Sequence, residues 1–166
     1  MMRRVFTAAA TLCLTASAAL ADWKAQTGAD MMTDEKWAAM AGETDLGTLF
    51  IIKCWEKGNI QAVVPVGPYD ASASFGPRVT AKFRVDKGEP FEIMMSPTNI
   101  KGFLAMGAAD DDARTIFTNV AAAAKERVIV VIDNGAMLLK ANAHGVAKAA
   151  EALTKLCKFP DSSKSE

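Results

Sequence analysis

Two cysteines and one histidine supply the most reactive side chains of this 166-residue chain. Cys54 and Cys157 lie about 100 residues apart, and a third cysteine, Cys13, falls inside the N-terminal leader described below. With His144 as the single histidine and no closely spaced ligand pair, we expect no metal site. In an oxidising compartment two remaining thiols usually form a disulfide, and closing a loop of this length stabilises a fold by up to ~4.7 kcal/mol. The alternative is a pair of buried free thiols.

Nucleophilic catalysis needs a nucleophile held beside a base, and the sequence shows no such arrangement. His144, next to Gly145, could act as an acid or base, but a capping or surface role suits it better. The serines at 72, 74 and 96 lack the flanking glycines of a nucleophile elbow. We therefore expect no catalytic residue and no enzyme. A small periplasmic hydrolase is the alternative, in which His144→Ala abolishes turnover.

Acidic and sulfur-rich clusters suggest ligands but have simpler interpretations. Residues 110 to 112 are three consecutive aspartates, which lack the spaced oxygens of a calcium loop and are typical of a helix start. The methionine pairs at 31–32 and 94–95 suit gaps in a core or an adaptable contact surface. They form no cluster with histidine that would hold copper. We expect no cofactor.

Four residues make a possible binding surface: Arg78, Lys82, Arg84 and Trp55. The three basic residues alternate on one face of a predicted strand and could meet an anionic polymer, although Asp86 shares that face. The simpler interpretation is a solvated strand face. The indole of Trp55 could stack on a sugar ring or complete the packing at the rim of the core.

The first 21 residues have the pattern of a secretory leader. Arg3 and Arg4 precede the apolar run 5–20, and Ala19-Leu20-Ala21 is a small-x-small cleavage site. The run is too short to span a membrane. We expect cleavage near Ala21, a periplasmic or secreted product, one α+β domain over 22–159 and a polar tail over 160–166.

Removal of the leader leaves 145 residues with 17 basic and 19 acidic side chains. That balance creates no field to hold nucleic acid, and no later segment is apolar and long enough to cross a bilayer. We expect neither a nucleic-acid-binding protein nor an integral membrane protein.

Hydrophobic periodicity predicts the elements that position these residues. Residues 22–47 are ambiguous: Thr33 could cap a helix reaching Met40, or Trp37, Ala39 and Ala41 could alternate along a strand. The later segments read as strands, turns and helices. Strands are expected over 48–55, 60–66, 78–86, 91–95, 100–106, 127–132 and 136–141, and helices from 110 to 124 and from 145 to 158.

Two of the connections carry strong turn signals. Residues 56–59 make a turn that joins a hairpin, and Asn134-Gly135 is the strongest hairpin signal in the chain. The predicted fold class is α+β, a largely antiparallel sheet with two packed helices, the last at the C-terminus. A disulfide would fasten that helix to an early strand.

Three segments together resemble the type VI secretion-associated periplasmic accessory family (VasI/TagO-type). They are Leu49-Phe-Ile-Ile-Lys-Cys54, the strand 78–86 and the terminal segment 149–157, which includes a shortened form of the family's closing helix pattern. The resemblance implies a non-enzymatic envelope accessory, whose partner is an envelope or secretion-system protein.

Three other segments are similar to the invasion-associated locus B type. They are Val64-Pro65-Val66-Gly67, Arg84-Val85-Asp86-Lys87-Gly88 and Ala143-His144-Gly145. That family's central cysteine pair has no counterpart around residues 96–102. This resemblance implies an exported, virulence-linked envelope protein, and neither family supplies catalytic residues.

Overall fold

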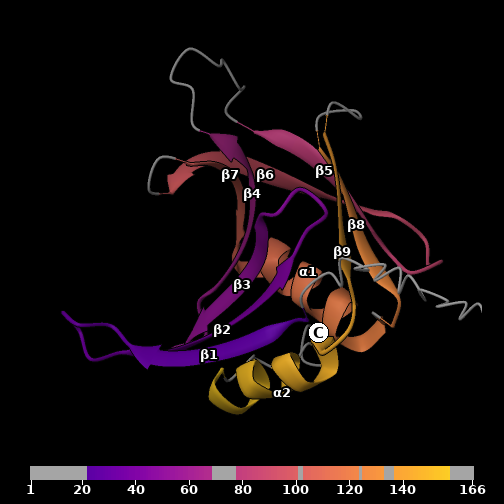
Figure 1. Ribbon diagram of the computed structural model, residues 1–166. Helices are drawn as coiled ribbons and strands as arrows, with labels where there is room; N and C mark the ends of the chain where they lie inside the picture. Colours follow the sequence, from indigo (N-terminus) through magenta and orange to yellow (C-terminus); the bar gives the residue numbers. More distant parts are fainter. Residues whose placement is uncertain (1–21, 69–77, 101–102, 124, 133–136, 158–166) are drawn as a thin grey trace, which may run out of the picture.

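The computed structural model describes residues 22–68, 78–100, 103–123, 125–132 and 137–157. In this part of the chain an antiparallel sheet of nine strands curls around two helices, which lie together at one end of the sheet (Figure 1). The strands are β1 (Lys24–Ala29), β2 (Lys36–Glu43), β3 (Leu49–Trp55), β4 (Ile60–Pro68), β5 (Val79–Val85), β6 (Phe91–Ile100), β7 (Phe103–Ala109), β8 (Arg127–Ile132) and β9 (Met137–Asn142). The helices are α1 (Asp110–Ala123) and α2 (Val146–Leu156).

The antiparallel sheet and the two helices, the last near the C-terminus, match the predicted class. The proportion of strand to helix is higher than that class implies. The fold is mostly β, because the ambiguous segment 22–47 forms two strands and not a helix. Trp37, Ala39 and Ala41 alternate along β2 with buried Ala38 and Met40, so the strand alternative was correct and the helix alternative wrong. The predicted Asn134-Gly135 turn lies outside the described residues.

The strand order is β1-β2-β3-β4-β7-β6-β5-β8-β9. Alternation along each strand puts one set of side chains into the curl and the other on the outer face. On β5, for example, Ala81 and Phe83 are buried, while Lys82 and Arg84 are exposed. The inner set forms a single core with the apolar sides of both helices.

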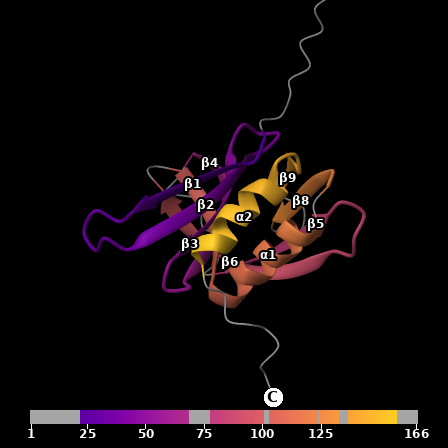
Figure 2. The ribbon, with the colours of Figure 1, turned by 90° about the horizontal axis from the view of Figure 1, so that it is seen from below.

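The two helices cover the inner face of the sheet. Figure 2 shows α2 running beneath the β1–β2 side, with α1 beside it toward β5. The buried residues of α1 are Ala113, Ile116, Phe117 and Val120, which recur at helical spacing and form one apolar stripe. Residue 124, where the predicted helix ends, lies outside the described residues. Helix α2 buries Val146, Ala149, Ala150 and Leu153.

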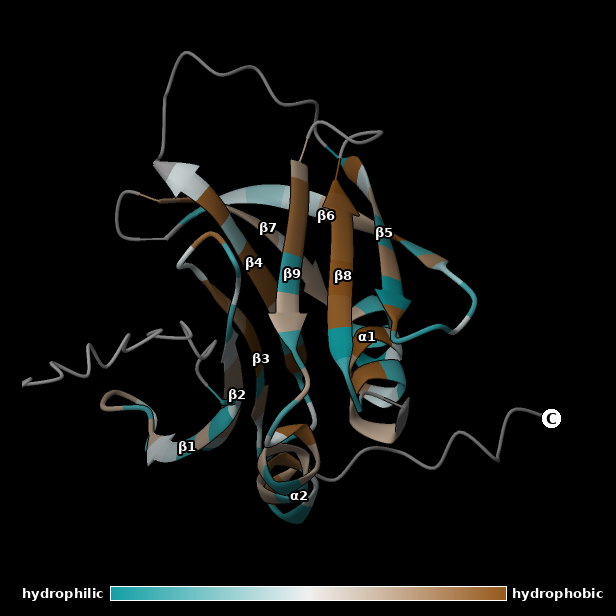
Figure 3. Cartoon of the chain, turned by 45° about the vertical axis from the view of Figure 1, so that its right-hand side comes forward, coloured by the Kyte–Doolittle hydropathy of each residue, from teal (hydrophilic) through white to brown (hydrophobic). Residues whose placement is uncertain are grey.

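Strand β8 is apolar along nearly its whole length, as the brown arrow in Figure 3 shows. Val128, Val130 and Ile132 are buried, and the intervening Ile129 and Val131 are half-buried. Their β-branched side chains fit a pleated surface, which explains why this strand begins and ends where the sequence predicts.

The predicted disulfide is present. Cys54 at the end of β3 and Cys157 just after α2 are bonded, with a Cα–Cα distance of 6.1 Å. Both side chains are almost completely buried. The bond therefore fastens the last helix to the inner face of the sheet, as the positions of the two cysteines in the sequence predict.

Candidate functional site

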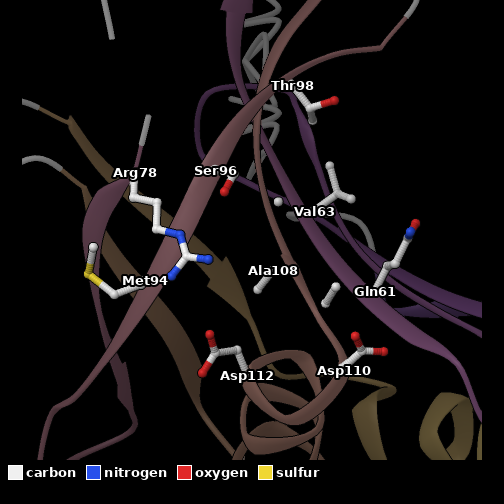
Figure 4. Close-up of a pocket in the computed structure, with 11 residues that line it drawn as sticks. Gln61, Val63, Arg78, Met94, Ser96, Thr98, Ala108, Asp110 and Asp112 are labelled. Carbon is white, nitrogen blue, oxygen red and sulfur yellow. The ribbon is translucent and has the colours of Figure 1, made fainter. Parts of the chain in front are cut away.

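A pocket of about 520 Å³ opens on the outer face of the sheet where β7 runs directly into α1 (Figure 4). Its lining comes from strands β4, β6 and β7, from helix α1 and from Arg78 just before β5, and small residues hollow its floor. The lining residues are Gln61, Val63, Arg78, Met94, Ser96, Thr98, Gly107, Ala108, Ala109, Asp110 and Asp112. A cavity of this size is in the range of sites for small ligands.

Strand register explains how these residues meet. Gln61 pairs with Ala109, and Gly107 pairs with Val63 on one side and Ser96 on the other. Paired residues of antiparallel strands point to the same face, so this row lies together on the outer surface. Gly107 leaves the floor open: a Cβ built there would meet Thr98 at 3.7 Å, an ordinary contact.

The charges of the pocket lie on opposite sides. The guanidinium of Arg78 projects into the pocket above Asp112, while Asp110 lies at the lower edge (Figure 4). No ion pair within 4.0 Å joins Arg78 to either aspartate in the described part of the chain. Both signs of charge therefore face the same space and are available to a ligand.

The three aspartates have separate roles. Asp111 forms an ion pair of 2.9 Å with Arg114 one turn along α1, and its backbone carbonyl accepts a hydrogen bond from the Thr115 hydroxyl. Asp110 has a φ of 51°, in the left-handed region. The helix starts where the acidic run predicts, and the carboxylates of Asp110 and Asp112 also line the pocket.

The predicted binding residues do not form one surface. Trp55 lies on β3, and three strands, β4, β7 and β6, separate it from β5. Of the basic residues, Arg78 lines the pocket. Lys82 forms an ion pair of 2.9 Å with Glu92, and Arg84 donates to the Gly88 carbonyl at 3.1 Å.

The sequence places Asp86 on the same strand face as the basic residues. In the structure, however, its carboxylate does not neutralise that face. Asp86 adopts a φ of 51° just after β5, and its carboxylate accepts hydrogen bonds from the backbone of Lys125, Glu126 and Arg127 at 2.8 to 2.9 Å. Burial acts to raise the pKa of Asp86, but these three amide bonds together outweigh it and hold the pKa below its usual value. Asp86 therefore anchors the start of β8.

Trp55 is half-buried on the outer face and is directly opposite Trp37. The ammonium of Lys53 lies 4.5 Å from the Trp55 ring centroid and 4.6 Å from that of Trp37. This cation–π arrangement covers ring surface that a sugar would need. The packing interpretation of Trp55 is therefore the one that the structure favours.

His144 lies away from the pocket, just before α2. Its Nδ1 is 2.6 Å from the Asp22 carboxylate, and both side chains are exposed.

Sequence reasoning missed Gln61, Thr98 and Gly107 as pocket residues, because only the pairing of β4, β7 and β6 brings them together.

The methionines lie in different environments. Met95 is buried, Met94 lines the pocket, and Met31 and Met32 are almost fully exposed.

No known family profile and no curated protein sequence matches the chain. A similar solved structure is that of invasion associated protein b from Bartonella henselae, with a TM-score of 0.49 and 14% sequence identity. The alignment covers 82% of this chain and 93% of that one. The name is that of the second family that the sequence resembles, and no comparison supports the type VI secretion family. None of the helices in the described residues is long and apolar enough to cross a membrane.

Proposed function

We propose that this chain is an exported, non-enzymatic binding domain of the cell envelope, and that the outer pocket holds a small zwitterionic ligand. The observation that supports the ligand class is the placement of Arg78 opposite Asp110 and Asp112 around one open space. A guanidinium binds a carboxylate through two parallel hydrogen bonds, and aspartates attract an ammonium group. Free amino acids and short peptides present both groups.

The polar floor adds selectivity to this charge pattern. Gln61, Ser96 and Thr98 supply an amide and two hydroxyls, which can hydrogen-bond a peptide group between the two charged ends. Met94 and Val63 add apolar walls. The pocket therefore suits a dipeptide with small side chains better than a purely anionic polymer.

Export is supported by two observations of different kinds. The N-terminal 21 residues have the pattern of a cleavable leader. The Cys54–Cys157 bond is of the kind that persists outside the reducing cytoplasm. We propose a periplasmic or secreted mature form beginning at Asp22, which N-terminal sequencing of protein from the envelope fraction would test.

The ligand proposal is tested by titrating the mature protein with alanyl-alanine in a calorimeter. Replacing Arg78 by Gln or Asp112 by Asn removes one charge from the site and should weaken binding about tenfold or more, because a charge-assisted hydrogen bond contributes roughly 1.5–3 kcal/mol. Gly107→Leu should abolish binding, because the leucine side chain fills the floor of the pocket. A Cβ at this position makes only ordinary contacts, so the substitution itself does not clash with the fold.

Lys82→Gln is the matched control, since Lys82 lies on the same face but is paired with Glu92 outside the pocket. Its affinity should equal that of the unchanged protein. Equal binding of neutral N-acetyl-alanine amide, or binding unaffected by Gly107→Leu, would contradict the ligand class. Conversion of the dipeptide to products, followed by NMR, would contradict the non-enzymatic role.

A part in host-cell entry is a narrower form of this proposal. It is supported by the segments 64–67, 84–88 and 143–145, which are similar to the invasion-associated locus B type. Deleting the gene should then lower entry into host cells, and the Gly107→Leu chain should fail to restore it. An accessory role in a secretion apparatus rests on the other sequence resemblance alone; capture of secretion components with the mature protein would support it.

A further inference from the structure

Strand β1 forms an open edge of the sheet. It pairs with β2 over all six residues, from Lys24 with Ala41 to Ala29 with Lys36, and it is the terminal strand in the order found for the described residues. An edge strand presents backbone N–H and C=O groups in the spacing that another extended chain needs.

The hydrogen bonds at both ends of β1 show which residues face the open edge. The Asp30 amide donates to the Glu35 carbonyl across the hairpin, so the even-numbered residues of β1 bond to β2. The Trp23 amide points the other way and donates to the His144 carbonyl. By the same alternation, the backbone groups of Ala25, Thr27 and Ala29 point outward from the edge.

The side chains of these same three residues point toward the inner face, yet they are exposed. The residues that pair with them on β2 are more buried. Ala38 and Met40 are fully buried under α2, whereas Thr27 and Ala25 are not covered. All three side chains are small. A strip of uncovered inner face therefore runs beside the open backbone.

A groove of about 580 Å³ lies between this strip and the last turns of α2. It is lined by Thr27, Gly28, Ala29, Lys36, Trp37, Ala152, Lys155 and Leu156, and most of its surface is apolar. Lys155 is paired with Glu151 at 2.7 Å, whereas Lys36 is exposed and has no ion-pair partner among the residues that the structure describes. The groove thus has an apolar floor and an available cation at its rim.

We propose that β1 and this groove bind an extended peptide segment of a partner protein, which adds a tenth strand to the sheet. The backbone of the peptide pairs with Ala25, Thr27 and Ala29. Its inward side chains alternate into the groove against Leu156, and an acidic side chain meets Lys36. This is strand addition beside a helix, in which main-chain bonds provide affinity and the pocket selects side chains. The site is separate from the outer pocket and does not depend on the ligand proposed there.

The test uses the mature, disulfide-bonded protein and a fluorescent peptide of sequence VTVEVTV, acetylated and amidated at its ends. We expect saturable binding measured by fluorescence anisotropy, together with slower hydrogen exchange at the Ala25, Thr27 and Ala29 amides. The same peptide with alternate backbone nitrogens methylated should not bind, because it lacks the donors that pair with the edge.

Thr27→Pro removes one outward N–H from the edge, a position where proline is tolerated in a strand. It should weaken peptide binding about tenfold. Leu138→Pro, on the opposite edge strand β9, is the matched control. The backbone groups of Lys140 bond to Asp45 and therefore point outward from the sheet. Leu138 lies two residues away, so its N–H points outward as well. Circular dichroism establishes that both variants are folded. Leu156→Asp is a second test variant. It changes a half-buried side chain of the groove and leaves the backbone of β1 unchanged.

The proposal is overturned by undetectable binding up to about 1 mM peptide, by equal binding of the methylated peptide, or by undiminished binding in both Thr27→Pro and Leu156→Asp. A dimer in sedimentation velocity that Thr27→Pro dissociates would show that a second copy occupies this edge, which also overturns it. Arg78→Gln should leave peptide binding unchanged, so failure of the outer pocket and failure of this groove are distinguishable.

Discussion

Two aspartates hold local structure through hydrogen bonds from backbone amides. Asp86 accepts three backbone N–H bonds at the start of β8, and Asp30 accepts from Met32, from Thr33 and from the Thr33 hydroxyl in the β1–β2 turn. The hydrogen bonds from Met32 and Thr33 hold the pKa of Asp30 below its usual value. Asp30 thus organises a turn that displays two exposed methionines.

Asp86→Asn should lower the free energy of unfolding at neutral pH by about 1–3 kcal/mol, because the charged acceptor of three amides is lost. Since the folded pKa of Asp86 is depressed, its stabilisation is complete above the unfolded pKa and is lost as pH falls through the folded pKa. The difference between the two proteins should therefore shrink below about pH 4.

Urea unfolding at several pH values measures this effect. Asp34→Asn is the matched control, since Asp34 also has a left-handed φ, of 56°, and lies in a turn. Asparagine tolerates that conformation as aspartate does, so the control should change stability little. A pH-independent loss at Asp86 would show that packing and not charge is responsible.

At the scale of elements, α2 depends on the disulfide and on a narrow apolar stripe. The helix has 11 residues, which is short for independent stability in water. Leu153 is fully buried, and the bond from Cys157 to Cys54 on β3 holds the C-terminal end against the sheet. The groove proposed for the peptide is therefore built on a helix whose position is covalently maintained.

Replacing both Cys54 and Cys157 by alanine should lower the free energy of unfolding by about 2–4 kcal/mol, because the unfolded chain is no longer constrained. Guanidinium unfolding with and without a reductant measures the loss. The reductant should destabilise the unchanged protein and have no effect on the double variant. Equal stability of the disulfide-bonded protein and the double variant, both without reductant, would contradict a structural role for the bond.

At the scale of the whole molecule, the two ends of the curled sheet meet through Trp23 and Asp45. The Trp23 indole donates to the Asn142 carbonyl at 2.6 Å, and its ring packs edge-on against Phe50 with centroids 5.5 Å apart. Asp45 bonds to Lys140 through its amide and its carboxylate, beside a bridge between Thr44 and Ala141. These contacts join the β1–β2 end to β9.

Two glycines allow this closure. The Trp23 ring lies so close to Gly42 that any side chain there would overlap it. Gly145 has a φ of 82°, and a Cβ would lie 2.7 Å from the Trp23 carbonyl. The approach of β1 to the start of α2 therefore requires glycine at both positions.

Trp23→Ala should lower the free energy of unfolding by about 3–5 kcal/mol, because it leaves a cavity and removes a contact between the sheet ends. Trp37→Ala is the matched control, since it removes the same side chain from the half-buried outer face and should cost clearly less. Chemical denaturation measures both. Equal losses would show that the ends of the sheet are held together by other contacts.

The amino-acid sequence by itself determined the elements whose signals are local: β8, the turn at 56–59, the helix beginning at the aspartates, the terminal helix and the positions of the two cysteines. Periodicity reports which face of one segment is buried, and that was sufficient there. Periodicity did not decide between helix and strand for the segment 22–47, because the exposed edge strand β1 has no regular apolar face.

Only the tertiary structure decided which segments are neighbours. The outer pocket exists because the register of β4, β7 and β6 brings Val63, Gly107 and Ser96 side by side, and the groove exists because α2 stops short of covering β1. Such placements depend on contacts between distant parts of the chain, and no local pattern encodes their register.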